Sequence, residues 1–320
     1  MTSVYAEARP TTPEPEGLDA FWARHLAAAR EAAEPASFAP YRPEVYGRLA
    51  VDDVTFTGAQ GAPIRAWLLR PRDLREPLPC LVSFIGYGGG RGVPADHTTY
   101  AAAGYAELVM DTRGQGGKWS PGGTGDPGAG SSGSEHPGML TRGILSPDDY
   151  YYTRLFVDAV RAVDTAAAHP DVDATRVAVG GASQGGALAL AAAALAPDLV
   201  RLCHADVPFL CDIEGSLEEA EEPPFTELIN YLAQHVDAVA RALATVAHVD
   251  CAILARRIRA RTLISVGLKD PICPPVGIYA AYNAIEAPKR LVVHRYGDHS
   301  VPSLQGELRL ADFAAEMGAP

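Results

Sequence analysis

The stretch that most constrains the fold of this chain is centred on Ser183. An apolar run at 176–179 leads into Gly181-Ala182-Ser183-Gln184-Gly185, and an alanine-rich run follows at 187–197. A buried strand, a G-x-S-x-G turn and a helix in this order are typical of a nucleophile elbow. Gly181 and Gly185 suit such a turn, because a Cβ at either position would clash where strand and helix backbones approach each other. The segment predicts a serine nucleophile, and an ordinary glycine-rich strand-to-helix turn is the alternative.

Short apolar runs recur along the chain with helical segments between them. They lie at 80–85, 107–110, 176–179, 202–205, 262–266 and 291–294. Continuously apolar strands alternating with helices are typical of a parallel sheet covered on both faces. Before them, runs at 51–56 and 64–69 flank a glycine-containing turn and predict an antiparallel hairpin. The expected fold class is α/β, specifically an α/β-hydrolase fold with a mostly parallel central sheet.

The length permits either one or two domains, and we predict a single domain over residues 1–320. A helix is expected at 18–33 and an irregular connection at 35–43, within an N-terminal clasp at 1–45. A second helical insertion, at 212–259, begins with acidic residues and continues with amphipathic stretches, so we expect a lid or a subunit interface there. Residues 112–133 contain nine glycines without periodicity and predict a long loop.

Composition excludes several classes of partner. The net charge is −12, and the absence of Lys/Arg runs argues against nucleic acid and anionic membranes. The longest apolar run is too short to span a bilayer, and the polar residues 1–17 do not resemble a signal peptide, so a cytoplasmic location is expected. Five cysteines without C-x-x-C spacing predict reduced thiols rather than a disulfide or zinc site.

Two later residues are placed to complete a catalytic triad with Ser183. Asp270 directly follows the apolar strand at 262–266, and His299 follows the last predicted strand. This is the chain order of nucleophile, acid and histidine that the fold uses. Asp298 is an alternative acid, but as the direct neighbour of His299 it is better placed to stabilise a turn. A turn-capping role is also the alternative for Asp270.

The predicted chemistry is acyl transfer. His299 would remove the proton of Ser183, Asp270 would orient the imidazole, and Ser183 would attack an ester carbonyl. The oxyanion would be held by the backbone N–H of Gln184 and by that of Tyr87, in the glycine-rich loop after the early strand at 80–85. The Gln184 side chain is not required for this geometry. No cofactor is needed.

Six segments together resemble one enzyme family. They are Asp111-Thr112-Arg113-Gly114-Gln115-Gly116, Tyr150-Tyr151-Tyr152, Gly181-Ala182-Ser183-Gln184-Gly185-Gly186, Pro208-Phe209-Leu210-Cys211, Gly267-Leu268-Lys269-Asp270-Pro271-Ile272-Cys273-Pro274-Pro275 and Ala280-Ala281-Tyr282-Asn283. In order and spacing they are similar to the acetyl xylan esterase and cephalosporin C deacetylase family of carbohydrate esterases. The resemblance runs from about residue 15 to the C-terminus.

The resemblance implies removal of acetyl groups from acetylated xylo-oligosaccharides and from cephalosporin C. It also implies that there is no metal or cofactor, and that subunits assemble into homo-oligomers, in this family ring-shaped hexamers. Arg113 and Gln115 would correspond to residues that brace the elbow, together with Gly181 and Gly185. Tyr87 would line the acetyl pocket.

Two positions depart from the family pattern. Ile85 replaces a histidine that usually precedes Gly-Tyr, and Ser300 replaces a glutamate that usually follows the catalytic histidine. We expect the first to alter hydrogen bonding near the oxyanion loop and the second to weaken a loop or subunit contact. Three alternatives remain open: a broader carboxylesterase, a prolyl-type peptidase and a non-catalytic scaffold. The sequence does not fix the natural acyl acceptor.

Overall fold

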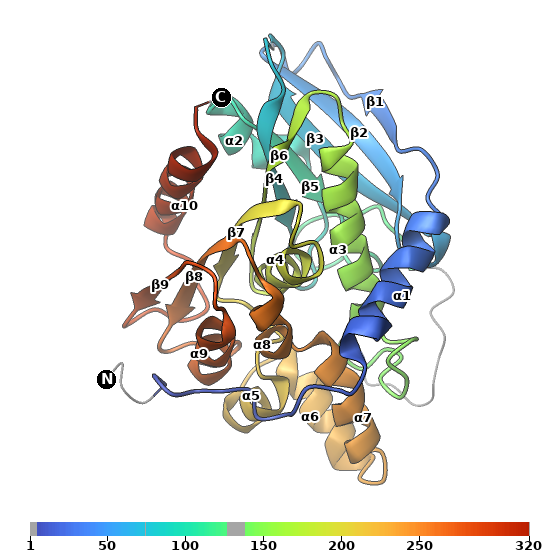
Figure 1. The fold of residues 1–320 in the computed structure, drawn as a ribbon, viewed down its shortest axis with the longest axis vertical. Helices are drawn as coiled ribbons and strands as arrows, with labels where there is room; N and C mark the ends of the chain where they lie inside the picture. The colour runs from blue at the N-terminus through green and yellow to red at the C-terminus, as the bar shows by residue number, and fades with distance from the viewer. Residues whose placement is uncertain (1–4, 74, 127–137, 320) are drawn as a thin grey trace.

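The computed structural model describes residues 5–73, 75–126 and 138–319, and over these residues nine strands form one sheet (Figure 1). The spatial order is β1-β2-β3-β5-β4-β6-β7-β8-β9. The strands are β1 Ser37–Pro40, β2 Leu49–Thr57, β3 Pro63–Pro71, β4 Leu78–Phe84, β5 Ala106–Met110, β6 Val172–Ala182, β7 Val200–Asp206, β8 Arg261–Gly267 and β9 Lys289–His294.

The sheet is parallel from β5 to β9 and antiparallel from β1 to β3. β3 joins the two parts by pairing antiparallel with β5. The predicted parallel strands and the predicted hairpin are thus confirmed. The prediction of an irregular connection at 35–43 was wrong in part, because Ser37–Pro40 forms strand β1, which pairs with β2. An edge strand needs only one hydrogen-bonded side, so proline is tolerated there.

Helices cover both faces of the sheet. One face carries α1 Leu18–Glu31, α3 Tyr151–Ala167, α4 Gln184–Leu195, α8 Cys251–Leu254 and α9 Pro275–Ala284. The other carries α2 Thr99–Ala102 and α10 Ser303–Met317 over a smaller apolar cluster that includes Leu81, Leu202 and Phe313. α4 is alanine-rich and almost wholly buried, so it packs close to the sheet directly behind Ser183.

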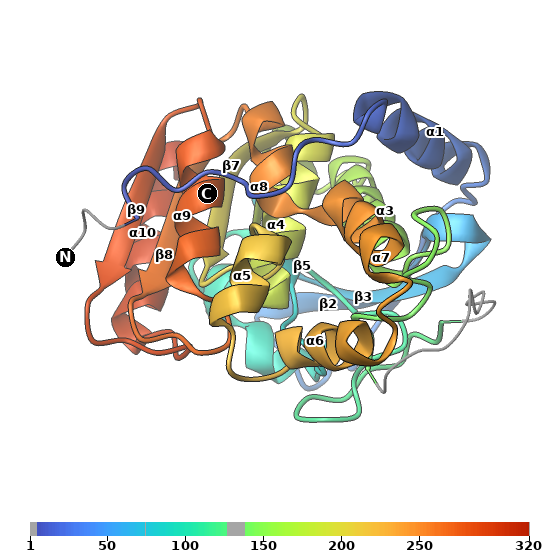
Figure 2. The same cartoon turned by 90° about the horizontal axis from the view of Figure 1, so that it is seen from below.

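The insertion between β7 and β8 contains α5 Ile213–Glu219, α6 Phe225–Gln234 and α7 Val239–Val246 before α8. The N-terminal segment runs past α9, α8 and α5 to α1, as the two views in Figures 1 and 2 agree. Along this path the backbone N–H and the hydroxyl of Thr11 donate to the Asp212 carboxylate, and Glu14 pairs with Arg257. These contacts tie residues 11–14 to the insertion.

The glycine-rich loop predicted at 112–133 contains no helix or strand over residues 112–126, and the remainder lies outside the described residues. Within the described part of the chain, no helix has both the length and the apolar character needed to cross a membrane. All five cysteines are buried and free.

Candidate active site

Ser183 occupies a strained turn between β6 and α4. Its φ of 57° and ψ of −121° lie outside the regions that most non-glycine residues adopt. Close backbone packing makes the two flanking glycines necessary. A Cβ on Gly181 would lie 2.5 Å from the carbonyl carbon of Gly185, and one on Gly185 would lie 2.3 Å from the carbonyl oxygen of Phe84. The N–H of Ser183 donates to the carbonyl of Asp206 at 2.9 Å, which fixes the turn to the end of β7.

The Asp270 carboxylate is buried after β8, and both of its oxygens are engaged. Oδ1 accepts from the backbone N–H groups of Ile272 and Cys273, each at 2.9 Å. Oδ2 lies 2.8 Å from Nδ1 of His299, whose side chain is 24% exposed. With Nδ1 donating to the carboxylate, Nε2 of His299 is left with the lone pair that a general base requires.

Ser183 and His299 line the same pocket, of about 460 Å³, which opens at the carboxyl ends of the parallel strands. No hydrogen bond joins these two side chains in the part of the chain that the structure describes. Catalytic hydrogen bonds in free enzymes are often long and shorten when substrate binds. Burial raises the pKa of the Cys273 thiol well above its usual value, and the nearby Ser183 hydroxyl lowers that pKa to a smaller extent.

The loop after β4 supplies the other wall of the pocket. Gly86 and Tyr87 line it beside Ser183, and Gln184 is the first residue of α4. The Gln184 side chain, for which the sequence predicted no required part, joins the elbow to this loop. Its Nε2 donates to the carbonyl of Ile85 at 3.2 Å, and its Oε1 accepts from Nε2 of Gln115 at 2.9 Å.

Gln115 and Arg113 brace different parts of the structure. Gln115 reaches the loop after β4, because its Oε1 accepts from the N–H of Gly88 at 2.6 Å. The Arg113 guanidinium is buried and binds Asp158 of α3 through two hydrogen bonds and Asp126 through one. Burial alone would lower the pKa of Arg113, but these two carboxylates raise it. Arg113 therefore anchors the glycine-rich loop to α3.

Two residues that were not among the sequence-based candidates also lie at the site. Trp119 lines the pocket with 62% of its surface exposed, and its Nε1 donates to the carbonyl of Tyr87 at 2.9 Å. Glu227, on α6, accepts from the hydroxyl of Tyr87 at 2.8 Å. For Trp119, the sequence does offer a signal, since it is a lone tryptophan in a glycine-rich loop. Nothing local to Glu227 relates it to Tyr87, 140 residues away.

The two departures from the family pattern have distinct surroundings. The Ile85 side chain belongs to an apolar cluster with Trp67 and Val109, and Ile85 also lines the pocket. The N–H of Ser300 donates to Asp298 Oδ1 at 2.7 Å. Asp298 therefore stabilises the turn at the histidine, as expected from its position next to His299.

Asp270, Cys273 and His299 present possible metal-ligand atoms within 4.8 Å of one another. The carboxylate is already bonded to His299 and to two backbone N–H groups, and the buried thiol resists deprotonation. Zinc binds cysteine as the thiolate. The donor chemistry therefore fits a hydrogen-bonded acid and histidine better than a resident metal.

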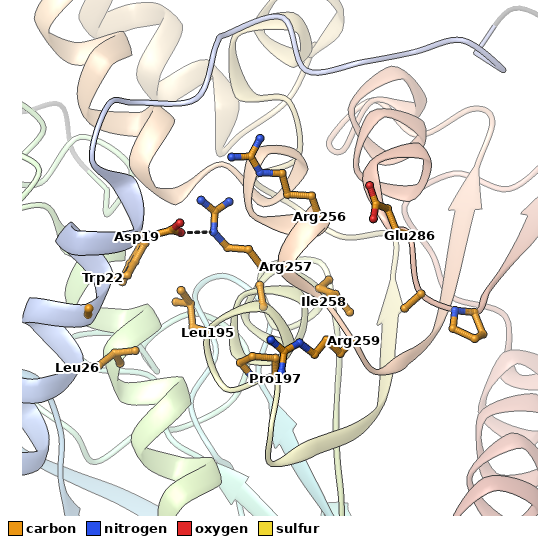
Figure 3. Close-up of a pocket in the computed structure, with 14 residues that line it drawn as sticks. Asp19, Trp22, Leu26, Leu195, Pro197, Arg256, Arg257, Ile258, Arg259 and Glu286 are labelled. Atoms are coloured by element: carbon orange, nitrogen blue, oxygen red, sulfur yellow. Dashed lines mark hydrogen bonds and ion pairs between the residues drawn. The ribbon is translucent and has the colours of Figure 1, made fainter.

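A larger cavity, of about 780 Å³, is elsewhere (Figure 3). It lies beside residues 256–259 and 286–288, which immediately precede β8 and β9, so it is at the opposite end of the strands from Ser183. Its arginines are paired: Arg257 binds Glu14 and Asp19, and Arg259 binds Asp198. Among the described residues that line this cavity, no group is comparable to the serine and histidine of the smaller pocket.

Comparison with known proteins gives a consistent result. Residues 4–316 match the family model of acetyl xylan esterase (AXE1). The acetyl esterase Axe7A of Xylanibacter ruminicola is 30% identical over 297 residues, covering 91% of this chain but 65% of that protein. The solved acetyl xylan esterase from Paenibacillus sp. R4 is 33% identical with a TM-score of 0.91, and acetyl xylan esterase 1 from Thermoanaerobacterium sp. JW/SL YS485 is 31% identical with a TM-score of 0.90. Each structural match covers 99% of both chains.

These matches confirm the α/β-hydrolase fold and the family resemblance inferred from the sequence. The chain belongs to the acetyl xylan esterase family, a family of carboxylic ester hydrolases.

Proposed function

We propose that the protein is a serine esterase that removes acetyl groups from acetylated xylo-oligosaccharides and other small acetyl esters, including cephalosporin C. Ser183, His299 and Asp270 form its catalytic triad. The observation that carries the proposal is that Ser183 and His299 line the same pocket, with Asp270 hydrogen-bonded to Nδ1 of His299. Family membership supports acetyl esters as the substrate class.

In the acylation step, Nε2 of His299 accepts the hydroxyl proton of Ser183 while Oγ attacks the acetyl carbonyl carbon. The carbonyl oxygen becomes an oxyanion that accepts hydrogen bonds from the backbone N–H groups of Tyr87 and Gln184. Asp270 stabilises the imidazolium and keeps it oriented. The carbon–oxygen bond to the sugar then breaks, and the leaving alcohol takes the proton from His299.

Deacylation repeats these roles with water. His299 removes a proton from water while the water oxygen attacks the acetyl carbonyl carbon, and the bond from that carbon to Oγ of Ser183 then breaks as Oγ takes the proton from His299 and acetic acid leaves. The alcohol part of the substrate extends towards the mouth of the pocket, where Trp119 is exposed. A flat aromatic surface at this point suits the apolar face of a sugar ring.

The test is steady-state hydrolysis of p-nitrophenyl acetate, butyrate and longer esters, with acetylated xylo-oligosaccharide and cephalosporin C as further substrates. Acetyl-selective turnover that Ser183→Ala abolishes is the expected result. Turnover that extends to long acyl chains would indicate a broader carboxylesterase, and cleavage of prolyl peptides instead of esters would indicate a peptidase. A wild-type protein inactive on all of these would indicate a scaffold.

Further properties belong to the same proposal. We infer one domain over 1–320, in which residues 1–45 clasp the insertion at 212–259, and the hydrogen bonds between Thr11 and Asp212 support this. We also infer a cytoplasmic homo-oligomer, of which a hexamer is the form implied by the family. Light scattering after gel filtration tests the oligomeric state, since the mass of a monomer would contradict assembly into a homo-oligomer.

A further inference from the structure

We propose that Glu227 is a positioning residue for the oxyanion hole: from α6 it orients Tyr87, whose backbone N–H stabilises the transition state. This inference rests on the proposed function, and it assigns to the insertion a part in catalysis. It concerns how the oxyanion donor is held, and adds no group that touches substrate.

The hydroxyl group of Tyr87 makes short hydrogen bonds to Glu227 and to the backbone of Met139. The Tyr87 hydroxyl lies 2.8 Å from both carboxylate oxygens of Glu227, so a single O–H donor is shared between two acceptors. The same hydroxyl accepts from the backbone N–H of Met139 at 2.7 Å. Burial, together with the nearby Glu227 carboxylate, raises the pKa of Tyr87, so the phenol remains a donor. Three segments far apart in the sequence therefore meet at one oxygen atom.

Other contacts of the loop after β4 hold its backbone, whereas the contact with Glu227 holds the side chain of Tyr87. The carbonyl of Ile85 is held by Gln184, the N–H of Gly88 by Gln115, and the carbonyl of Tyr87 by Trp119. Those bonds fix the backbone on either side of the Tyr87 N–H. Glu227 fixes the side chain, and thus restrains rotation of the same residue about its Cα.

The Tyr87 N–H itself donates to no protein acceptor in the described part of the chain. Tyr87 and Ser183 line the same pocket. An oxyanion donor acts through its position about 2.7–3.1 Å from the developing charge, so a small rotation of Tyr87 weakens transition-state binding more than substrate binding. Glu227 lies on α6, while Pro223 and Pro224 just before this helix also line the pocket. The insertion therefore contacts both substrate space and the oxyanion loop.

The test is a double-mutant cycle of Glu227→Ala and Tyr87→Phe, assayed with p-nitrophenyl acetate. Each single variant is expected to lower kcat about 10-fold, a part of the ~100-fold that loss of an oxyanion donor costs, with KM nearly unchanged. The loss in the double variant should be clearly smaller than the product of the two single losses, because both single variants remove the hydrogen bond between Tyr87 and Glu227. Each also removes one bond from the backbone at 139–140, which is the N–H of Met139 for Tyr87 and the N–H of Leu140 for Glu227. Tyr87→Phe removes a single oxygen atom, so it reports on the contact even if Glu227→Ala folds poorly.

Three further measurements separate positioning from a general loss of structure. Glu227→Gln, which retains one acceptor oxygen, should recover most of the lost kcat. The inhibition constant of a trifluoromethyl ketone, whose hemiketal oxyanion occupies the hole, should rise about 10-fold in Glu227→Ala, in parallel with the fall in kcat/KM. Glu218→Ala, an exposed change on α5 of the same insertion, should behave as the wild type.

Additive losses in the cycle, or a rise in KM without a fall in kcat, would overturn the inference. The outcome is distinct from failure of the proposed function. If Ser183→Ala is inactive while Glu227→Ala matches the wild type, only the positioning role is wrong. If Ser183→Ala remains active, the proposed catalytic mechanism itself is wrong.

Discussion

Replacing Asp270 by asparagine should inactivate the enzyme while leaving its fold intact. Asp270 Oδ1 accepts from two backbone N–H groups, those of Ile272 and Cys273, and Oδ2 faces Nδ1 of His299. An asparagine amide placed here has only one oxygen. If its NH2 group faced the two backbone N–H groups, donors would face donors and neither N–H would have an acceptor. The amide oxygen must therefore accept from these two N–H groups.

The NH2 group of the asparagine then points at Nδ1 of His299 and donates to it. The neutral imidazole must carry its proton on Nε2, where it can no longer accept the proton of Ser183. In a serine protease, the same substitution lowers kcat about 10⁴-fold through this change of tautomer. We expect a similar loss here, equivalent to about 5 kcal/mol of transition-state stabilisation.

The assay is kcat/KM for p-nitrophenyl acetate at about pH 7.5, together with thermal unfolding of the same preparations. Asp298→Asn is the matched control, because Asp298 is the neighbouring acid, and it should retain activity within about threefold. If Asp270→Asn keeps activity within about 10-fold of the wild type, Asp270 does not orient the base. If Asp298→Asn is the inactive variant, the acid has been misassigned.

Three other substitutions test the turn at Ser183, the mouth of the pocket and a buried carboxylate on β5. Gly185→Ala should lower the free energy of unfolding by about 2 kcal/mol in a denaturant titration, because its Cβ would lie 2.3 Å from the Phe84 carbonyl, whereas Gly47→Ala, with no atom within 4 Å, should not. Trp119→Ala should raise KM for acetylated xylo-oligosaccharide about 10-fold, as expected for loss of one stacked ring, and should change KM for p-nitrophenyl acetate much less. Burial raises the pKa of Glu107 to about 7, so the folded state binds more protons than the unfolded chain between about pH 4.5 and 7, and stability falls over that range. Glu107→Gln should remove about 3 kcal/mol of this fall when unfolding is compared at about pH 5 and pH 8, and an unchanged pH dependence would contradict the assignment.

The sequence was sufficient to predict the elements whose signals are local. The turn at Ser183 and the parallel strands can be predicted because each has a signal in residues adjacent in the chain. Asp270 and His299 each follow a strand, and the carboxyl ends of parallel strands lie at one edge of the sheet, so the sequence also predicts that both residues lie near Ser183. β1 was missed because Pro40 reads as a strand breaker, and only its position at the sheet edge makes it acceptable. That position is a property of the whole sheet and is not visible in residues 35–43.

The side chains that support the loop after β4 also come from distant parts of the sequence. Gln184 was assigned a part through its backbone alone, yet its side chain contacts Gln115 and the carbonyl of Ile85, 69 and 99 residues away. An acidic residue on an amphipathic helix is most simply a solvated one, so the sequence gives no signal that Glu227 contacts Tyr87. A side chain that holds another in place needs no characteristic neighbours of its own, since its partner comes from a different segment. A motif is therefore enough to propose which residues react, whereas the residues that would position them become visible only when the contacts of the folded chain are known.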